Sequence, residues 1–397
     1  MNILAFTTLW PNSEQPGFGL FVKNRLCALS RIEDVKLRCV APVPFFPQSL
    51  NSRFIPNRWA LMSRIPEFEK IEGIETWHPR YLVTPKIGMS FYGRWMAKGA
   101  EGLIRRLHEA DPIDLIDAHY VYPDGYAAVK IARKLGLRVV ITARGTDINL
   151  FSEMPSIRPL IKATLQKAGH IVAVSAALKD KIVSLGIAEQ KISVVRNGVD
   201  KSVFHLRDMT QSRRKLGIEQ ESKIILAAGS LVKEKGFDRL IDAMSLLDSR
   251  GLKLYIAGEG PERERLQGKI DRLGLSKKIV LAGVKAQAEL AEWYSAADLL
   301  CLVSHREGCP NVVIESLSCG TPVVSVDVGG VRELISEPDC GHIIDEYSAA
   351  ALAEAIFCAL DRKWNRAGIA STGAAATWDD VAADLVGIYK RLSFKHL

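Results

Sequence analysis

The chain has 397 residues, of which 48% are hydrophobic and 25% charged, and these values are ordinary for a soluble globular protein. The length exceeds that of one ordinary core and predicts two domains of roughly 150–200 residues each. No apolar run approaches the ~20 residues that cross a bilayer. The seven cysteines form no CxxC pair, which predicts free thiols in a reducing cytoplasm.

The positive charge lies in the first half of the chain. Residues 1–200 hold 27 Lys and Arg against 18 Asp and Glu, whereas residues 201–397 hold 26 against 27. This asymmetry indicates an anionic partner for the first half, such as a membrane surface, a lipid phosphate or an acidic polymer. A basic surface without a specific partner explains the same numbers.

The first half alternates between apolar strands and amphipathic helices. The N-terminal MNILAFTTLWP has no basic segment and no cleavage site, and it predicts a strand rather than a signal peptide. Further strands are predicted, in chain order, at VKLRCVAP, DLIDAHY, RVVITAR, HIVAVS and ISVVRNG. Helical patterns between them include GLFVKNRLCALSR, SFYGRWMAKGAEGLIRRLHEA and DGYAAVKIARKLG.

The second half restarts this alternation after a polar stretch at 197–217. Its predicted strands are KIILAAGS, KLYIAGEG, KIVLAGV, LLCLVS, TPVVSVDVGG and GHIID. Short, nearly all-apolar strands alternating with helices are typical of buried parallel sheets. The sequence therefore predicts an α/β protein with two Rossmann-like doubly wound domains, at 1–202 and 203–375. A last helix at 376–397 is predicted to pack back on the first domain, and the ligand site is predicted in the cleft between the domains.

The stretch EGCPNVVIE places Glu307 and Glu315 on either side of a tight turn. It follows the buried strand LLCLVS, and Pro310 suits the first position of a helix that would end at Gly320. The N–H groups at the start of this helix, on Asn311 and Val312, predict a phosphate site.

Two glutamates beside an anion site are best explained as acceptors for sugar hydroxyls on either side of a diphosphate. The alternative is that Glu315 simply faces solvent. An acid/base pair for hydrolysis fits poorly, because Glu315 is predicted in the second helical turn rather than beside the bond to be cut.

The run EGCPNVVIESLSCGTPVVSVDVGG closely resembles the Glu-x7-Glu signature of retaining, nucleotide-sugar-dependent glycosyltransferases of the GT-B fold, family 4. The resemblance implies that Glu307 contacts hydroxyls of the donor sugar and that Glu315 binds the ribose. Pro310 has no N–H, so the amides that hold the sugar and diphosphate would be those of Gly308, Cys309, Asn311 and Val312.

The stretch LAAGSLVKEKGFDRLIDA (226–243) is similar to the family pattern Gly-Arg-Leu-x3-Lys-Gly. Lys235 matches the lysine, and a lysine can neutralise the leaving diphosphate as a point charge. Ser230 stands where the family has arginine; Lys233 or an arginine of the first domain would have to compensate. The resemblance also places Val284 and Lys285 beside the nucleotide base, mostly through backbone groups.

The resemblance extends to the first half. It implies that the loop with Gly17 and Gly19 approaches the donor diphosphate and the acceptor, with a plain surface turn as the alternative. His119 in HYVYPDG would contact the donor sugar or orient the acceptor, although a lone histidine is more often structural. Arg144 replaces the histidine of a His-Gly-x-Asp pattern, and Arg144 and Asp147 are acceptor-side candidates.

Two stretches mix cations with large apolar side chains: NSRFIPNRWALMSR (51–64) and KIGMSFYGRWMAK (86–98). They are consistent with a patch at the level of lipid headgroups, where aromatics and cations are favoured. Taken separately, each stretch fits a core face with charged edges slightly better. Together with the charge asymmetry, they predict a cytoplasmic protein with peripheral contact at the inner face of the membrane.

No Asp-x-Asp stands at a strand end and no P-loop is present, so we expect a metal-independent transferase without a cofactor and without a nucleic-acid partner. Its donor would be a UDP- or GDP-sugar and its acceptor a hydroxyl of a glycan or lipid-linked molecule. The N-terminal segment resembles bacterial enzymes of envelope and capsular polysaccharide assembly. The alternatives are a nucleotide-sugar 2-epimerase of the same fold and a nonenzymatic nucleotide-sugar-binding or membrane-surface protein.

Overall fold

The computed structural model describes residues 1–45, 57–84, 88–247, 251–335, 338–372 and 376–393. The chain divides into two compact units, and each is described by itself. Unit 1 comprises Met1–Asn197 together with the segment that begins at Trp378, and unit 2 comprises Gly198–Thr377. The division therefore falls slightly before the predicted boundary at 202, because Val199 already pairs with Thr377 of unit 2. The predicted cleft between the domains stays a prediction.

Unit 1 is built on an eight-stranded sheet with the order β10-β9-β8-β7-β1-β2-β5-β4, in which all neighbours are parallel except β4 and β5. The strands of this sheet are β1 (Asn2–Phe6), β2 (Lys36–Val40), β4 (Phe68–Ile71), β5 (Ile74–Trp77), β7 (Leu115–His119), β8 (Arg138–Ala143), β9 (His170–Ala173) and β10 (Ile192–Val194). A separate parallel pair is formed by β3 (Val43–Phe45) and β6 (Arg80–Leu82). The helices are α1 (Leu20–Ser30), α2 (Asn57–Arg64), α3 (Met89–Ala110), α4 (Tyr126–Leu135), α5 (Thr146–Asn149), α6 (Arg158–Lys167), α7 (Ala176–Ser184) and α16 (Trp378–Ser393).

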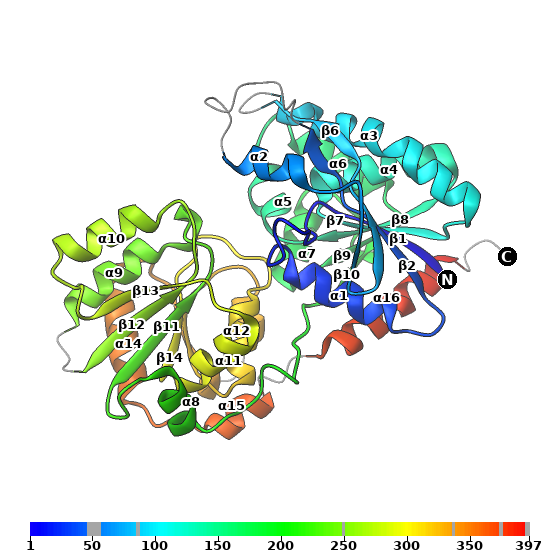
Figure 1. The fold of residues 1–397 in the computed structure, drawn as a ribbon. Helices are drawn as coiled ribbons and strands as arrows, with labels where there is room; N and C mark the ends of the chain where they lie inside the picture. The colour runs from blue at the N-terminus through cyan, green and yellow to red at the C-terminus, as the bar shows by residue number, and fades with distance from the viewer. Residues whose placement is uncertain (46–56, 85–87, 248–250, 336–337, 373–375, 394–397) are drawn as a thin grey trace. The chain divides into compact units, whose positions relative to one another are not determined.

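Helices cover both faces of the unit 1 sheet. Helices α1 and α16 pack against each other on one face (Figure 1), where Leu26, Leu385 and Tyr389 are buried with side chains of β1 and β2. The other face carries α3, α4 and α6, each in contact with its neighbour. The last helix of the chain therefore belongs to unit 1.

Unit 2 has a six-stranded, fully parallel sheet in the order β13-β12-β11-β14-β15-β16. Its strands are β11 (Lys223–Ala228), β12 (Leu252–Ala257), β13 (Ile279–Gly283), β14 (Leu299–Leu302), β15 (Val323–Val326) and β16 (Gly341–Ile344). Its helices are α8 (Met209–Leu216), α9 (Phe237–Leu246), α10 (Arg263–Arg272), α11 (Gln287–Ala296), α12 (Asn311–Ser318), α13 (Val331–Leu334), α14 (Ala349–Asp361) and α15 (Arg366–Thr372). Numbered within the unit, this is the strand order 3-2-1-4-5-6 of a dinucleotide-type Rossmann fold.

The strand order places a topological switch point in each unit. In unit 2, β11 and β14 are neighbours in the middle of the sheet. The strands that follow β11 are added toward one edge, and those that follow β14 are added toward the other. In unit 1, β1 and β7 have the same relation. In open α/β sheets, ligands bind outside the carboxyl ends of the strands at such a switch point. Among the described residues, no helix is long and apolar enough to cross a membrane.

Two glycines bring the loops after β11 and β12 together. Gly258 has φ +151°, and a Cβ there would lie 1.9 Å from the Gly229 carbonyl oxygen.

We expect Gly258→Ala to lower the free energy of unfolding by about 3 kcal/mol, from backbone strain and the clash, as measured by urea denaturation. Gly268→Ala is the matched control: it lies in α10, and a Cβ added there would have nothing within 4 Å, so the change should stabilise by roughly 1 kcal/mol. Equal effects of the two changes would contradict this explanation.

Candidate functional site

The loops after β11 and β14 meet at the switch point of unit 2. Lys235 ends a short 3-10 turn (Lys233–Lys235) after β11, and Glu307 follows β14. The Lys235 Nζ lies 2.7 Å from Glu307 Oε1, with the two side chains 28% and 12% exposed. An ammonium and a carboxylate at the carboxyl edge of a parallel sheet, both still reachable from solvent, can serve a ligand that has an anionic part and hydroxyl groups.

The Glu307 loop is held in place from several sides. The Gly330 N–H donates to the Gly308 carbonyl oxygen at 3.0 Å. Gly329 has φ +54°, and a Cβ there would lie 2.3 Å from the Glu307 carbonyl oxygen. The His305 N–H donates to the Glu234 carbonyl at 2.8 Å, which ties this loop to the Lys235 turn. The ion pair therefore rests on two loops with a fixed separation.

Helix α12 begins at Asn311, and Pro310 is its N-cap, with ψ 108°. The prediction that Pro310 is the first helical residue was therefore wrong by one position, because its extended ψ keeps it outside the helix. Cys309 is buried, whereas Asn311 and Val312 are half-buried. Their predicted contacts with the sugar and diphosphate stay predictions.

Glu315 lies in the second turn of α12, as predicted, and it does not simply face solvent. The Tyr294 hydroxyl, from α11, donates to Glu315 Oε2 at 2.9 Å. Burial raises the pKa of Glu315 to about 7, against the lowering effect of this hydrogen bond. The sequence analysis missed Tyr294; the signal is a tyrosine in the last turn of the helix that precedes β14.

The other unit 2 candidates occupy the same edge of the sheet. Ser230 is exposed in the loop after β11, two residues beyond the end of the strand. Val284, directly after β13, is 71% exposed. The Lys285 ammonium pairs with Glu289 at 2.8 Å and lies over the Trp293 ring. Because this ammonium already has a partner, any contact of Lys285 with a base falls to its backbone.

The two candidate glycines in the loop before α1 differ in how closely they are packed. Gly19 is the N-cap of α1, with φ +64°, and a Cβ there would lie 2.3 Å from the Leu9 carbonyl oxygen. Gly17 is exposed, with nothing within 4 Å of the equivalent position. Gly19 is therefore required by the packing of this loop, whereas the packing does not require Gly17.

His119, at the end of β7, is completely buried. Arg144 Nη2 donates to His119 Nδ1 at 2.7 Å, and His119 Nε2 lies 3.2 Å from Asp117 Oδ2. Because arginine can only donate, Nδ1 is the acceptor and Nε2 carries the proton. Burial lowers the pKa of His119 to about 4, with the Asp117 charge acting in the opposite direction.

The ring of His119 therefore faces protein groups on both sides. His119 thus links the end of β7 to Arg144. Its predicted contact with the donor sugar or the acceptor stays a prediction. A sequence alone shows a histidine at a strand end but not the buried aspartate two residues before it that engages the ring.

Arg144 and Asp147 are also occupied within unit 1. Arg144 Nη1 donates to Asn197 Oδ1 at 3.0 Å, in addition to the bond with His119. Burial lowers the pKa of Arg144 to about 9. Asp147 is buried and accepts backbone N–H groups of Val121 at 2.8 Å and Gly145 at 2.8 Å. Both residues thus hold the loops at the unit 1 switch point, and their predicted role on the acceptor side stays a prediction.

The predicted membrane stretches are described only in part. Residues 51–56 and 86–87 lie outside the described residues, as do the side chains of 57–60. On α3, Phe91 is 48% exposed, its ring stacks on Trp95 at 5.7 Å, and the Arg94 guanidinium lies over it. Met96 is fully buried. The stretch therefore divides into a core face and an exposed aromatic and cationic face.

Comparisons with known proteins agree with these observations. Residues 208–373 match the family described as Glycosyl transferases group 1, and residues 66–203 match Glycosyltransferase Family 4. The chain is 30% identical over 362 residues to TuaC of Bacillus subtilis, named for teichuronic acid biosynthesis glycosyltransferase activity, with 90% of this chain and 88% of the relative covered. Among solved structures, sucrose-phosphate synthase of Thermosynechococcus elongatus superimposes with a TM-score of 0.80 at 18% identity, covering 98% of both chains. Anabaena HepE in complex with UDP gives 0.74 at 18% identity, covering 98% of this chain and 100% of that one.

Proposed function

Because this chain belongs to the glycosyltransferases of group 1 and family 4, we propose that it transfers a sugar from a nucleoside-diphosphate sugar to an acceptor hydroxyl with retention of the anomeric configuration. Its two parallel-sheet α/β units are those of the GT-B class. The observation that carries the proposal is the Lys235–Glu307 pair at the switch point of unit 2.

The donor would lie along the carboxyl edge of the unit 2 sheet. Glu307 accepts hydrogen bonds from hydroxyls of the sugar, and Lys235 faces the diphosphate. Glu315, in the second turn of α12, accepts from the ribose hydroxyls. Support comes from the partners of the two carboxylates: Glu307 is next to a cation, whereas Glu315 is held by the neutral Tyr294 hydroxyl. The cation beside Glu307 suits the end of the donor where the sugar meets the diphosphate, and a neutral partner suits Glu315 at the uncharged ribose.

The proposed chemistry needs no metal. Lys235 supplies a positive charge beside the leaving diphosphate, and the start of α12 adds the positive end of a helix dipole. The bond between the anomeric carbon and the phosphate oxygen breaks, and a bond to the acceptor oxygen forms on the same face. The acceptor proton passes to the leaving phosphate oxygen, so that no protein nucleophile is required.

We propose a hydroxyl of a glycan or lipid-linked molecule as the acceptor, in the synthesis of cell-envelope polysaccharide. The similarity to a relative named for teichuronic acid biosynthesis supports this role. The excess of positive charge in residues 1–200 and the exposed face of α3 with Phe91 and Arg94 support peripheral contact with an anionic membrane at its inner face. Failure to co-sediment with anionic vesicles at low salt would contradict the membrane part of the proposal.

The decisive experiment is a thermal-shift screen of the full chain against UDP- and GDP-sugars, followed by product analysis with the donor that stabilises most. We expect stabilisation by one donor and slow hydrolysis or transfer of its sugar. Formation of an epimer without any acceptor would overturn the transferase assignment. Binding without turnover in the presence of glycan and lipid-linked acceptors would do so as well.

Nucleotide binding should depend on pH through Glu315. Its pKa of about 7 means that the carboxyl is protonated below pH 7 and then has lost acceptor capacity for ribose hydroxyls. We expect binding of the nucleoside diphosphate to be about tenfold weaker at pH 6 than at pH 8, as measured by calorimetry. Glu315→Gln removes the titration and should flatten this dependence to that of the ligand's own phosphate. An unchanged slope in Glu315→Gln would contradict the ribose role.

A further inference from the structure

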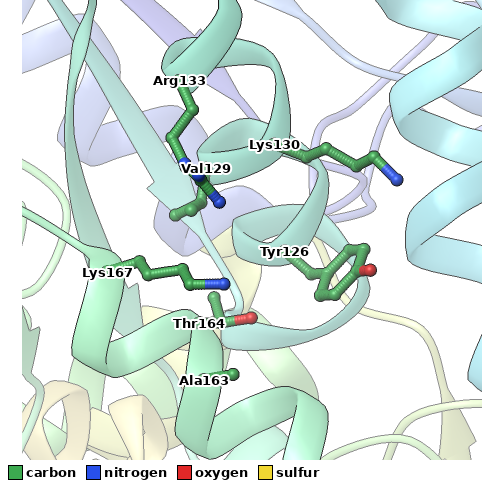
Figure 2. A pocket seen from close by; sticks show the side chains of 7 residues that line it. All are labelled: Tyr126, Val129, Lys130, Arg133, Ala163, Thr164 and Lys167. Carbon is green, nitrogen blue, oxygen red and sulfur yellow. The ribbon is translucent and has the colours of Figure 1, made fainter.

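A pocket on unit 1 lies between α4 and α6. It is lined by Tyr126, Val129, Lys130, Arg133, Ala163, Thr164 and Lys167 (Figure 2), and it encloses about 480 Å³, including space open to solvent. Its lining contains three cations and no acid. We propose that this pocket binds a dianionic phosphate group, a phosphate monoester or a diphosphate, at a site separate from that of the sugar donor.

The three cations have no partners in the described part of the chain. The side chains of Lys130, Arg133 and Lys167 form no ion pair or hydrogen bond with the described residues. Lys134, the residue after Arg133, shows the usual alternative, because its ammonium pairs with Glu101 at 2.6 Å. Like charges gathered around one concavity repel each other unless an anion neutralises them.

The neutral part of the lining suits an anion with an ester group. The Tyr126 hydroxyl accepts from Arg94 Nε at 3.4 Å, which leaves its own O–H available to donate. The Thr164 hydroxyl donates to the Leu160 carbonyl at 2.7 Å, so this group adds no donor. Val129 and Ala163 provide an apolar floor. Figure 2 shows the Arg133 and Lys167 head groups reaching from the two helices toward the space between them, whereas Lys130 extends on the side of Tyr126.

The position of the pocket separates it from the donor chemistry. Helix α4 connects β7 to β8, and α6 leads from β8 to β9, all parallel strands. Such helices return the chain to the amino edge of the sheet, so their last turns lie there. Arg133 and Lys167 are in those last turns. His119 and its loop lie at the opposite, carboxyl edge. Tyr126, by contrast, is the first residue of α4. A phosphate held by Arg133 and Lys167 is therefore not the diphosphate of the reacting donor.

Lysine footprinting on the full-length protein tests the proposal residue by residue. Acetylation of Lys130 and Lys167 is followed by mass spectrometry with inorganic pyrophosphate, at an ionic strength matched with NaCl. At a pyrophosphate concentration about ten times its Kd, we expect about tenfold slower modification of these two lysines. Lys98 and Lys162, exposed and outside the pocket, should react at unchanged rates.

Two variants and one further arm complete the test. Arg133→Gln should abolish the protection, and the charge-matched Arg106→Gln, on α3 outside the pocket, should leave it intact. Protection of all four lysines alike, or protection that survives Arg133→Gln, would overturn the site. Vesicles with phosphatidylglycerol form the other arm: protection by vesicles but not by pyrophosphate would show a monoanionic lipid surface and refute a dianion pocket. The readout is acetylation of the pocket lysines and does not involve Lys235. A negative result would therefore count against the phosphate pocket and not against the proposed sugar transfer.

Discussion

Replacing Glu307 by alanine will lower kcat by about 10²–10³-fold while the affinity for the free nucleoside diphosphate changes little. The carboxylate is proposed to accept from hydroxyls of the sugar, whose bond to the diphosphate is the one that breaks. These contacts strengthen as the anomeric carbon gains positive charge, so their loss falls mainly on the transition state. Steady-state kinetics with the donor identified in the screen, together with calorimetry of the nucleoside diphosphate, measures both quantities.

The control is Glu234→Ala, an exposed acid in the same turn as Lys235. It removes an equal charge at the same edge of the sheet without touching the ion pair. We expect less than a twofold change in kcat for Glu234→Ala. A similar loss in both variants would indicate a general effect of charge. A large loss of nucleoside diphosphate affinity in Glu307→Ala would refute the assignment of Glu307 to the sugar and Glu315 to the nucleotide.

The relative positions of Glu307 and Glu315 could be predicted because these two residues are close in sequence. Glu307 and Glu315 lie in one loop and the helix that follows, so strand and helix signals alone fix their separation. Lys235 is distant in the chain but follows the strand that is β14's neighbour in the sheet. It was singled out by its match to the family pattern Gly-Arg-Leu-x3-Lys-Gly, and the strand order brings it to the same edge of the sheet as Glu307.

The environment of His119 could not be predicted in this way. Its state depends on Asp117 and on Arg25 of α1, which is also buried. Burial acts to raise the pKa of Asp117. The electrostatic interactions of its carboxylate with His119 and Arg25 outweigh this effect and hold the pKa well below its usual range. Neither Asp117 nor Arg25 belongs to a pattern that a single sequence makes visible. An aspartate inside a predicted strand is a warning of a buried polar network, but it does not name the partners.

One hairpin was also missed. Strands β4 and β5 are antiparallel and joined through Glu72 and Gly73, both with positive φ. In FEKIEGIETW the apolar side chains recur every third residue rather than every second, so the stretch lacks the alternation that indicates a strand, and its turn lacks the usual Asn-Gly or Asp-Gly pair. The glutamate at positive φ replaces the expected asparagine or aspartate. Short edge strands of this kind depend on the neighbouring β2 for their register.

Replacing Lys235 by methionine is expected to lower kcat by about 10²-fold and to weaken nucleoside diphosphates while leaving the free nucleoside unaffected. The change removes the ammonium but keeps most of the stem, which passes over Gly229. Glu307 would lose its ion-pair partner but is 12% exposed, so water can solvate its carboxylate and the fold should persist. Calorimetry with nucleoside, monophosphate and diphosphate separates a role at the phosphates from a general loss of binding.

The double variant Lys235→Met with Glu307→Ala distinguishes a working pair from two independent groups. If Lys235 also holds the Glu307 carboxylate in position, Lys235→Met already impairs Glu307. The combined loss in kcat should then be clearly smaller than the product of the single losses. A fully multiplicative loss would show that the 2.7 Å contact has no part in catalysis. If Lys235→Met weakened the binding of nucleoside and nucleoside diphosphate equally, the lysine would lie away from the phosphates. An ammonium beside the phosphates would favour the diphosphate, because only that ligand carries negative charge.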